Sequence, residues 1–426
     1  MFNYNKKLKI SNISLSILGI TLCLWSTGWV FLDLVKASYL FFFSVVFISV
    51  GIFYFYVDIK YIKRPIIFFL IAFFSINTFY FMVGMVEYLY KNESLPFIIE
   101  YYIKQNLSVV FCLIFAPYLF SEENIDKFSS VIVFTYILIF SLLIFVYIFI
   151  FQSDFIGTAI NFDFGRSRQG KNTLGIFIVL IFPFILTYIL KNKVFFVGLI
   201  FLILYLFMIY NIDSTTVVVI SLFQLFLYGF LLSKKFFFKV LLILISLLVV
   251  FPNYVVKEIS TKGNSKTSEP SISEDLHYDP SDFSGNPYIE KPYLLLDSHR
   301  GRLFYSAIQK AKSNFFIGSG TQTFRIRDEV YVDGFQVLGR TETHNAYLSI
   351  IVDYGILGLF LYLFFYIYIF LKLVKNKNLR ITNYDFASVI YIISLLLSLN
   401  FINIEYTLAI WLLNGICLSR VVRQYK

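Results

Sequence analysis

Residues 343–371 read THNAYLSIIVDYGILGLFLYLFFYIYIFL and join a polar part of the chain to an apolar part. From residue 346 onward the run holds one charged residue, Asp353. A helix needs about 20 mainly apolar residues to cross the hydrocarbon core of a bilayer. The stretch therefore predicts a membrane-spanning helix over residues 346–371, entered directly from a long polar loop.

The whole chain has the composition of a membrane protein. Of its 426 residues, 58% are hydrophobic, 21% aromatic and 15% charged, whereas soluble domains carry about 25% charged residues. The net charge of +10 comes mostly from basic residues in short loops between apolar runs, which is typical of membrane anchoring. It does not indicate nucleic acid as a partner.

The cysteines and the first apolar run give no sign of a secreted domain. Cys23, Cys112 and Cys417 all fall inside apolar runs, so they predict no disulfide framework. The first run, residues 12–32, is longer than a signal-peptide core and lacks a small-residue cleavage site. We interpret it as a retained helix.

Twelve apolar runs are candidates for membrane spans. They cover residues 12–32, 37–57, 65–86, 103–120, 129–151, 172–190, 194–211, 215–232, 236–252, 346–371, 385–403 and 405–420. The predicted fold class is an all-α integral membrane protein with about 12 transmembrane helices. Residues 1–252 hold helices 1–9, residues 253–345 form a long external loop, and residues 346–426 hold helices 10–12.

Basic residues in the short connections predict the orientation. The two termini and every second connection together hold nineteen of them: Lys6, Lys7, Lys9, Lys60, Lys63, Arg64, Lys127, Lys191, Lys193, Lys234, Lys235, Lys239, Lys372, Lys375, Lys377, Arg380, Arg420, Arg423 and Lys426. The short connections on the other side hold six: Lys36, Lys91, Lys104, Arg166, Arg168 and Lys171. Because basic residues favour the cytoplasmic side, both termini are predicted to be cytoplasmic and the long loop external.

The long loop has two parts of different character. Residues 257–292 are rich in Ser, Pro, Gly and acidic residues and predict an irregular segment. Residues 298–315 have apolar side chains at helical spacing, with Ala307, Ile308 and Ala311 on one face and Lys310 and Lys312 on the other. This pattern predicts an amphipathic helix lying near the bilayer surface.

Arginines are the first candidates for chemistry. Arg300 and Arg302 open the amphipathic segment, and Arg325, Arg327 and Arg340 follow in the same loop. They suit two roles: anchoring to lipid headgroups, or bidentate binding of a phosphate or pyrophosphate. The excess of Arg over Lys between residues 300 and 340 favours oriented anion binding.

His344 is the second candidate. A lone histidine is most often structural, but His344 and Asn345 lie where the loop enters the predicted tenth span. The free N–H groups at a helix N-terminus favour anions, and a neutral imidazole there can act as a general base on a hydroxyl. Asp353 is expected to face the protein interior, as carboxylates in membrane spans do. His277 and His299 lack a comparable setting.

The loop before the sixth span is a third candidate. Residues 164–175 read FGRSRQGKNTLG and supply Arg166, Arg168, Lys171 and Asn172. Such a loop is either an ordinary basic connection or a second anion site, and basic loops are disfavoured on the external side. Asp213 is a weaker hint. The sequence contains no Walker-type loop, no His/Cys cluster with metal spacing and no Gly-x-Ser-x-Gly elbow.

Taken together, these motifs resemble the O-antigen ligase and O-antigen polymerase superfamily of bacterial surface-polysaccharide assembly. The resemblance is clearest over residues 298–359. It includes Arg300 with Phe304 and Ala307, then the turn NFFIGSG at residues 314–320, and then HNAYL at 344–348 followed by DYGILG at 353–358. The run GKNTLG at residues 170–175 is similar to an earlier external motif of the family.

The sequence departs from the family in two places. Members often carry an Arg beside Ser or Thr at the outer start of the eighth span, where this chain reads DSTT at residues 213–216. That phosphate contact is therefore missing or replaced. The basic residues before Asn172 also lie closer to it than is usual, so a role carries over to Arg166 or Arg168 only as a hypothesis.

The resemblance implies a metal-independent membrane glycosyltransferase with a GT-C-like architecture and no cofactor. Its donor would be a glycan linked to undecaprenyl pyrophosphate. Arg300 would hold the pyrophosphate, and His344 would take the proton of the acceptor hydroxyl. Arg302, Asn345, Arg166, Arg168, Lys171, Asn172 and Arg340 are the expected substrate-binding residues.

The function expected from the resemblance is polymerisation of lipid-linked O-antigen or capsular repeat units in the bacterial inner membrane, as part of lipopolysaccharide or other polysaccharide biosynthesis. A chain-length regulator is a candidate protein partner. The alternative is an O-antigen ligase, which transfers the glycan to lipid A-core. A flippase for lipid-linked oligosaccharides is the alternative from another class, but it would have more polar residues in its spans and no large external loop.

Overall fold

The computed structural model describes residues 13–23, 45, 64–90, 95–146, 168–212, 214–232, 307–308, 310–325, 330–332, 335–337, 345–375, 380, 383–400 and 408–423. Within these ranges the chain is mostly helical, with a turn that begins at residue 314 and one short β hairpin, which agrees with the all-α prediction. The predicted span 236–252 lies outside the described residues, and so does the span 37–57 except for Val45.

The elements follow the predicted order along the chain. After a helix at Ile13–Cys23 they are α3 (Arg64–Tyr90), α4 (Leu95–Val110), η2 (Phe111–Phe115), α5 (Ala116–Leu119), α6 (Glu122–Val146), α9 (Arg168–Asn192), α10 (Phe195–Ile212), α11 (Thr215–Leu232), η6 (Thr323–Arg325), β1 (Val330–Val332), β2 (Phe335–Val337), α15 (Ala346–Val374), α16 (Tyr384–Ser398) and α17 (Leu408–Arg423). The two strands pair antiparallel, with Val330 opposite Val337.

Ten of the twelve predicted spans coincide with helices in the described part of the chain. Five of these helices are long and apolar enough to cross a membrane: Ile66–Tyr90, Ile98–Phe115, Glu122–Leu142, Gly175–Asn192 and Ala346–Val374. Five more apolar helices of 10–17 residues accompany them. The chain is therefore a multi-pass membrane protein, whereas twelve crossings and a GT-C-like architecture stay predictions.

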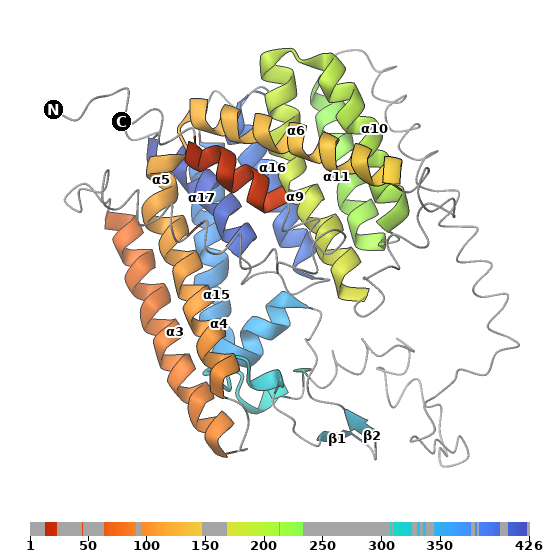
Figure 1. Ribbon diagram of the computed structural model, residues 1–426. Coiled ribbons are helices and arrows are strands. Elements are labelled where there is room, and N and C mark those ends of the chain that lie inside the picture. The colour runs from red at the N-terminus through yellow and green to blue at the C-terminus, as the bar shows by residue number, and fades with distance from the viewer. Residues whose placement is uncertain are drawn as a thin grey trace, which may run out of the picture.

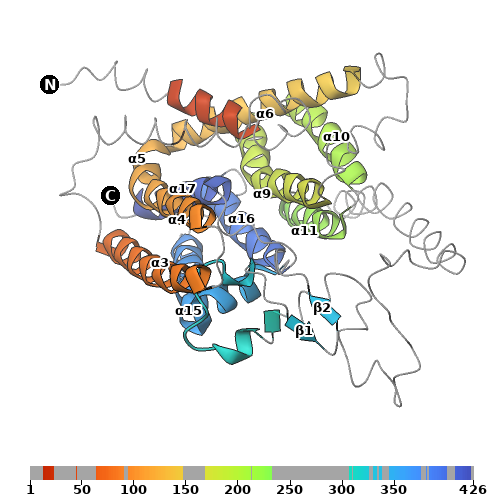
Figure 2. The same cartoon turned by 60° about the horizontal axis from the view of Figure 1, so that its bottom comes forward.

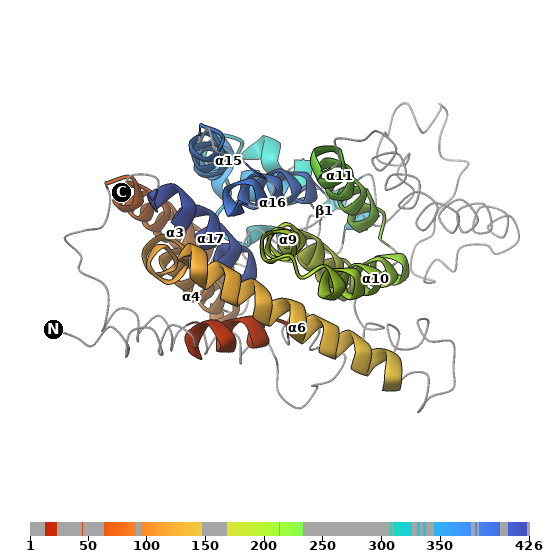
Figure 3. The same ribbon diagram turned by 90° about the horizontal axis from the view of Figure 1, so that it is seen from above.

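The apolar helices form a bundle in which α3, α4 and the long part of α15 run side by side (Figure 1). Aromatic rings join α3, α15 and α17, because Trp411 lies 5.5 Å from Phe73 and 5.8 Å from Phe365 between ring centroids. Helix α6 instead crosses one end of the bundle transversely, over α9 and α10 (Figures 1 and 3). Its direction thus differs from that of α3 and α15.

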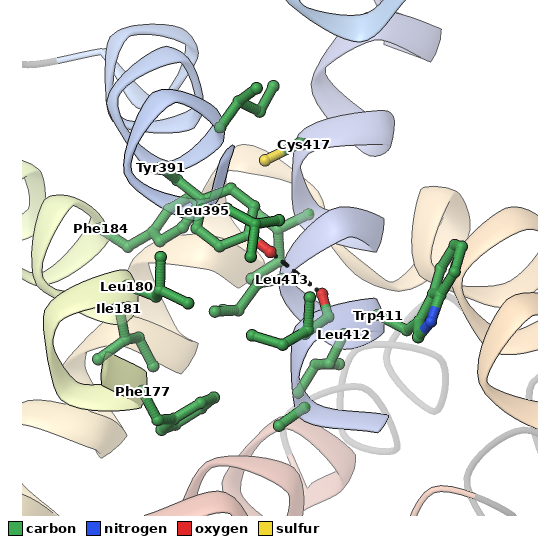
Figure 4. Packing of buried hydrophobic residues seen from close by; sticks show 14 of the residues in the cluster. Phe177, Leu180, Ile181, Phe184, Tyr391, Leu395, Trp411, Leu412, Leu413 and Cys417 are labelled. Atoms are coloured by element: carbon green, nitrogen blue, oxygen red, sulfur yellow. Dashed lines mark hydrogen bonds between the residues drawn. The ribbon is translucent and has the colours of Figure 1, made fainter. Parts of the chain in front are cut away.

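Helix α9 lies at the centre of the bundle. Of its most apolar stretch, 72% is buried inside the protein, against 28% for α3 and 33% for α15. Figure 4 shows Phe177, Leu180 and Phe184 of α9 facing α16 and α17. Polar groups in this core bond across helices, as when Gln224 donates to Ser394 over 2.8 Å. Such bonds hold apolar helices together where water is absent.

Helix α15 is broken at Gly355. That residue has φ 67° and ψ −173°, and the chain turns there between a short segment, residues 346–354, and a long one, residues 356–374. The prediction of one continuous helix over residues 346–371 is therefore wrong in this respect. Only the long segment runs alongside α3, and its 19 residues span about 28 Å, close to the thickness of a hydrocarbon core.

Charged side chains gather where four helix ends meet. Arg420 near the end of α17 contacts Asp385 at the start of α16 over 2.5 Å and Glu122 at the start of α6 over 3.4 Å. Lys191 at the end of α9 contacts Glu122 over 2.9 Å and Asp126 over 2.7 Å. The topology predicted from the sequence also places these four ends on one side of the membrane, and it stays a prediction.

Candidate functional site

Asn345 is the predicted site residue whose side-chain contacts the structure describes. It is the N-cap of α15, where its side-chain oxygen accepts the amide of Leu348 over 3.0 Å. Its amide group donates to the carbonyl of Asn400 over 3.2 Å. Asn345 thus joins the start of α15 to the end of α16, because one small amide side chain serves both as a cap and as a link.

The start of α15 is less open to an anion than the sequence predicted. The amide of Ala346 donates to the carbonyl of Leu399 over 2.8 Å, and the amide of Leu348 donates to the side-chain oxygen of Asn345. Two N–H groups of the first turn are therefore already bonded within the protein. An anion near His344 would have to rely on side-chain cations more than on these backbone groups.

Most of the other predicted site residues lie outside the described part of the chain. These are His344, Arg300, Arg302, Arg166, Arg340, and the weaker candidates Asp213, Arg327, His277 and His299. Arg168, Lys171 and Asn172 belong to the first turns of α9, which begins four residues before the predicted span. Their backbone is helical, so they open a helix instead of forming a loop. Arg325 closes η6.

A turn at residues 314–321 closes the break in α15. The amide of Ser319 donates to the carbonyl of Val352 over 2.7 Å, and that of Gly320 to Asp353 over 3.0 Å. On the far side of the break, the amide of Ile356 donates to the carbonyl of Phe315 over 2.9 Å. The turn therefore supplies the hydrogen bonds that α15 loses at Gly355, which is what allows a helix to break inside a membrane protein.

The same turn is attached to α3. The amide of Thr321 donates to the carbonyl of Tyr80 over 3.0 Å, and the hydroxyl of Tyr88 donates to the carbonyl of Gln322 over 3.2 Å. Gly320 approaches Gly84 so closely that a Cβ atom on Gly320 would lie 2.5 Å from the backbone nitrogen of Gly84. Two glycines thus allow direct backbone contact between the loop and α3.

The amphipathic helix before the turn uses its apolar face inside the protein. Residues 307, 308 and 310–313 are helical. Ala307 and Ala311 are buried in a cluster with Leu348 and Val352 of the short segment of α15, and Ile308 packs against it. In the described residues this face therefore packs against α15 and is buried inside the protein. The prediction that the helix lies near the bilayer surface stays a prediction.

Asp353 is buried at the break, with 1% of its surface exposed, in agreement with the expectation that it faces the interior. The next residue, Tyr354, stacks edge-on against Tyr80 at 5.2 Å and donates its hydroxyl to Gln105 of α4 over 3.2 Å. The break is thus held by α3 and α4 as well as by the turn. The DYGILG motif therefore has a structural role. Gly355 is the residue at which the helix breaks, and Asp353, Tyr354 and Ile356 bond or pack around that break.

The turn, the broken helix and its capped N-terminus lie at one end of the bundle (Figures 1 and 2). Most of their sequence lies within a range that matches a protein-family model. Residues 198–363 match the O-antigen ligase family model. The resemblance predicted from the motifs is thereby confirmed over this range, which runs from within α10 through α11 and the long loop into α15. A search of curated proteins gives no match.

The O-antigen ligase match covers less than half of the chain, but it includes His344, Arg300 and the whole of the break. The matched range excludes Gly84, Gln105 and Asn400. Sequence reasoning did not single out these three residues, because an isolated Gly, Gln or Asn in or beside an apolar helix carries no distinctive pattern.

Proposed function

We propose that this protein polymerises lipid-linked polysaccharide repeat units, with undecaprenyl-pyrophosphate-linked glycan as the donor. The observation that carries the proposal is the position of Asn345. It precedes α15 at the outer end of α16 in the predicted orientation. Its side chain bonds to the carbonyl of Asn400, and the amide of the next residue, Ala346, bonds to the carbonyl of Leu399. The residue before it, His344, is therefore attached to a fixed point where a lipid-linked substrate presents its head group.

In the proposed reaction, a sugar hydroxyl of the acceptor attacks the anomeric carbon of the donor glycan. A new glycosidic C–O bond forms while the bond from that carbon to the pyrophosphate oxygen breaks. Undecaprenyl pyrophosphate leaves with the electron pair, and His344 takes the hydroxyl proton as general base. Arg300 stabilises the charge that develops on the pyrophosphate. The protein needs no covalent nucleophile, because pyrophosphate is a good leaving group.

Other basic and polar residues of the predicted external segments take part in donor binding in this proposal. Arg302 and Arg340 belong to the long loop, and Arg166, Arg168, Lys171 and Asn172 stand before or within the first turns of α9. A guanidinium group suits this role since it holds two phosphate oxygens at once. A chain-length regulator is the proposed protein partner, and the inner membrane the proposed location.

The second candidate function is O-antigen ligation, in which lipid A-core is the acceptor. It is favoured by the description of the family model, which is that of an O-antigen ligase. Both functions share the donor and the proposed roles of Arg300 and His344. They differ in the acceptor alone, so the acceptor has to be varied in the experiment.

The test uses purified full-length protein with undecaprenyl-pyrophosphate-linked repeat units, in the presence and absence of lipid A-core, with products separated on a gel. A ladder of longer lipid-linked chains without lipid A-core supports the polymerase. Product that forms only with lipid A-core supports the ligase. If neither condition gives a product, the transferase proposal is overturned, and transfer of the units across proteoliposomes would then favour the flippase.

Two variants test the residue roles. His344→Ala and Arg300→Ala are expected to leave an inserted, monodisperse protein that forms no long-chain glycan. His277→Ala and Lys266→Ala, in the part of the loop predicted to be irregular, are the matched controls and should keep the wild-type product pattern. A normal ladder from either site variant would refute its assigned role.

A further inference from the structure

Three consecutive apolar residues project from the turn that closes the break in α15. Phe315, Phe316 and Ile317 are 42%, 71% and 60% exposed, and we name them the apolar tip. The rings of the two phenylalanines contact each other edge-on at 5.4 Å. A contiguous run of exposed apolar residues indicates contact with another apolar phase.

The apolar tip is fixed in place by its backbone. The amide of Gly318 donates to the carbonyl of Asn314 over 2.7 Å, which closes the turn, and the carbonyl of Phe315 accepts the amide of Ile356. A Cβ atom on Gly318 would lie 2.5 Å from the nitrogen of Gly355, so turn and helix touch backbone to backbone. The tip therefore cannot fold back into the protein without losing these bonds.

The depth of the apolar tip follows from the helices that hold it. Gly84, which contacts the turn, lies 20 residues after Arg64 at the start of α3, or about 30 Å at 1.5 Å per residue. Gly355 lies 17 residues before Lys372, or about 26 Å along the long segment of α15. Since a hydrocarbon core is about 30 Å thick, both helices place the turn at its outer boundary.

The apolar tip also continues the lipid-facing surface of α15. Leu357 and Phe360, one turn below the break, are 62% and 69% exposed and share one helix face. The residue bonded to the tip, Ile356, directly precedes Leu357. Lys312, just before the turn, is exposed as well, and a basic residue beside apolar ones is typical of segments that meet lipid head groups.

We infer that the apolar tip is a membrane anchor, which inserts Phe316 and Ile317 into the acyl boundary of the outer leaflet and so fixes the height of the external loop above the bilayer. The amphipathic helix before it does not supply this contact in its described residues, because its apolar face is used by α15. The anchor holds the turn against the break from the lipid side. The inference does not depend on the proposed reaction.

The test places a single fluorophore at the tip of the full-length protein in nanodiscs of phosphatidylethanolamine and phosphatidylglycerol. Phe316→Cys is labelled with bimane, and its fluorescence is measured with acyl-brominated lipids and with aqueous iodide. Phe360→Cys is the lipid-facing reference and Ser273→Cys, in the polar part of the loop, the aqueous reference. The native cysteines are buried, so wild-type protein carried through the same labelling gives the blank.

We expect bimane at position 316 to behave like bimane at position 360, with most of its fluorescence quenched by brominated lipid and little quenched by iodide. Quenching by iodide alone would overturn it, since the tip would then lie in water. Protection from both quenchers would overturn it too, because the tip would then be covered by protein. Ile317→Cys repeats the measurement if the first variant is not monodisperse. No substrate is present, so failure here says nothing against the proposed transferase.

Discussion

Gly318 and Gly355 lie against each other, each with a positive φ angle, 78° and 67° respectively. A Cβ atom on Gly318 would come 2.5 Å from the backbone nitrogen of Gly355. Neither position can carry a side chain without moving the turn or the helix, and both backbone conformations are ones that side chains disfavour. The contact between the external loop and the membrane helix therefore depends on two glycines 37 positions apart in the sequence.

Replacing one of these glycines should destabilise the protein markedly. Gly355→Ala forces a Cβ atom toward the backbone of Phe316 at a positive φ angle, and we expect a loss of about 2–4 kcal/mol. The melting temperature in detergent, followed by size-exclusion chromatography after heating, measures it. Gly198→Ala is the control, because its Cβ atom would meet only the Ile189 side chain, 2.5 Å away, within an ordinary helix. Equal losses in both variants would contradict a special role for Gly355.

Hydropathy was sufficient to predict where helices form, but not where one of them breaks. The run from Ala346 to Val374 is apolar on both sides of Gly355, and glycine is common in membrane helices. Nothing local marks Gly355 as different from Gly358 three residues later, which lies inside the helix. The break is explained by the turn at residues 314–321, whose amides donate hydrogen bonds to the carbonyls of Val352 and Asp353. A pattern read from neighbouring residues cannot reveal a partner that lies far away in the sequence.

Enlarging Gly84 should detach the turn from α3. Gly84→Leu places a side chain where the backbone of Thr321 lies, since even a Cβ atom there would be 2.8 Å from the Thr321 carbonyl oxygen. We expect faster cleavage of the external loop by trypsin, with insertion of the protein unchanged. Ser75→Leu, on an exposed position of the same helix, is the matched control and should be cleaved like the wild type. An unchanged cleavage rate in Gly84→Leu would show that the turn is held without α3.

The ion pair between Arg420 and Asp385 should stabilise the bundle more than an exposed pair does. The side chain of Asp385 is 2% exposed and that of Arg420 11%, and removal of one partner from a buried pair costs about 3–5 kcal/mol. Arg420→Ala is expected to lower the melting temperature strongly, while Lys127→Ala, from an exposed pair with Glu123, should change it little.

The double variant Arg420→Met with Asp385→Leu separates this charge effect from packing. Because an apolar pair of similar size leaves no buried charge, it should recover most of the stability lost in Arg420→Ala. If the double variant is as unstable as Arg420→Ala, the stability lost in Arg420→Ala comes from packing and not from the unpaired carboxylate of Asp385.

The candidate site was predicted from the residue types that the proposed chemistry requires. The motif around Asn345 predicted a helix start, and α15 does begin at Ala346. The sequence could not show that amides of the first turn donate hydrogen bonds to the carbonyl of Leu399 and to the side chain of Asn345. The end of α16 is more than 50 residues away, so its closeness to Asn345 follows from the tertiary fold alone.

Asn345 should affect stability and transfer separately, because it has two bonding groups. Asn345→Ala removes the cap of Leu348 and the link to Asn400, and we expect a loss of about 1 kcal/mol together with a strong fall in glycan transfer. Asn345→Ser keeps a cap acceptor but loses the reach to Asn400, so its melting temperature should stay near the wild-type value while transfer falls. Thermal melts and the gel assay with lipid-linked repeat units measure the two effects. A serine variant with full transfer would show that the link to Asn400 does not position His344, and that Asn345 acts through its cap.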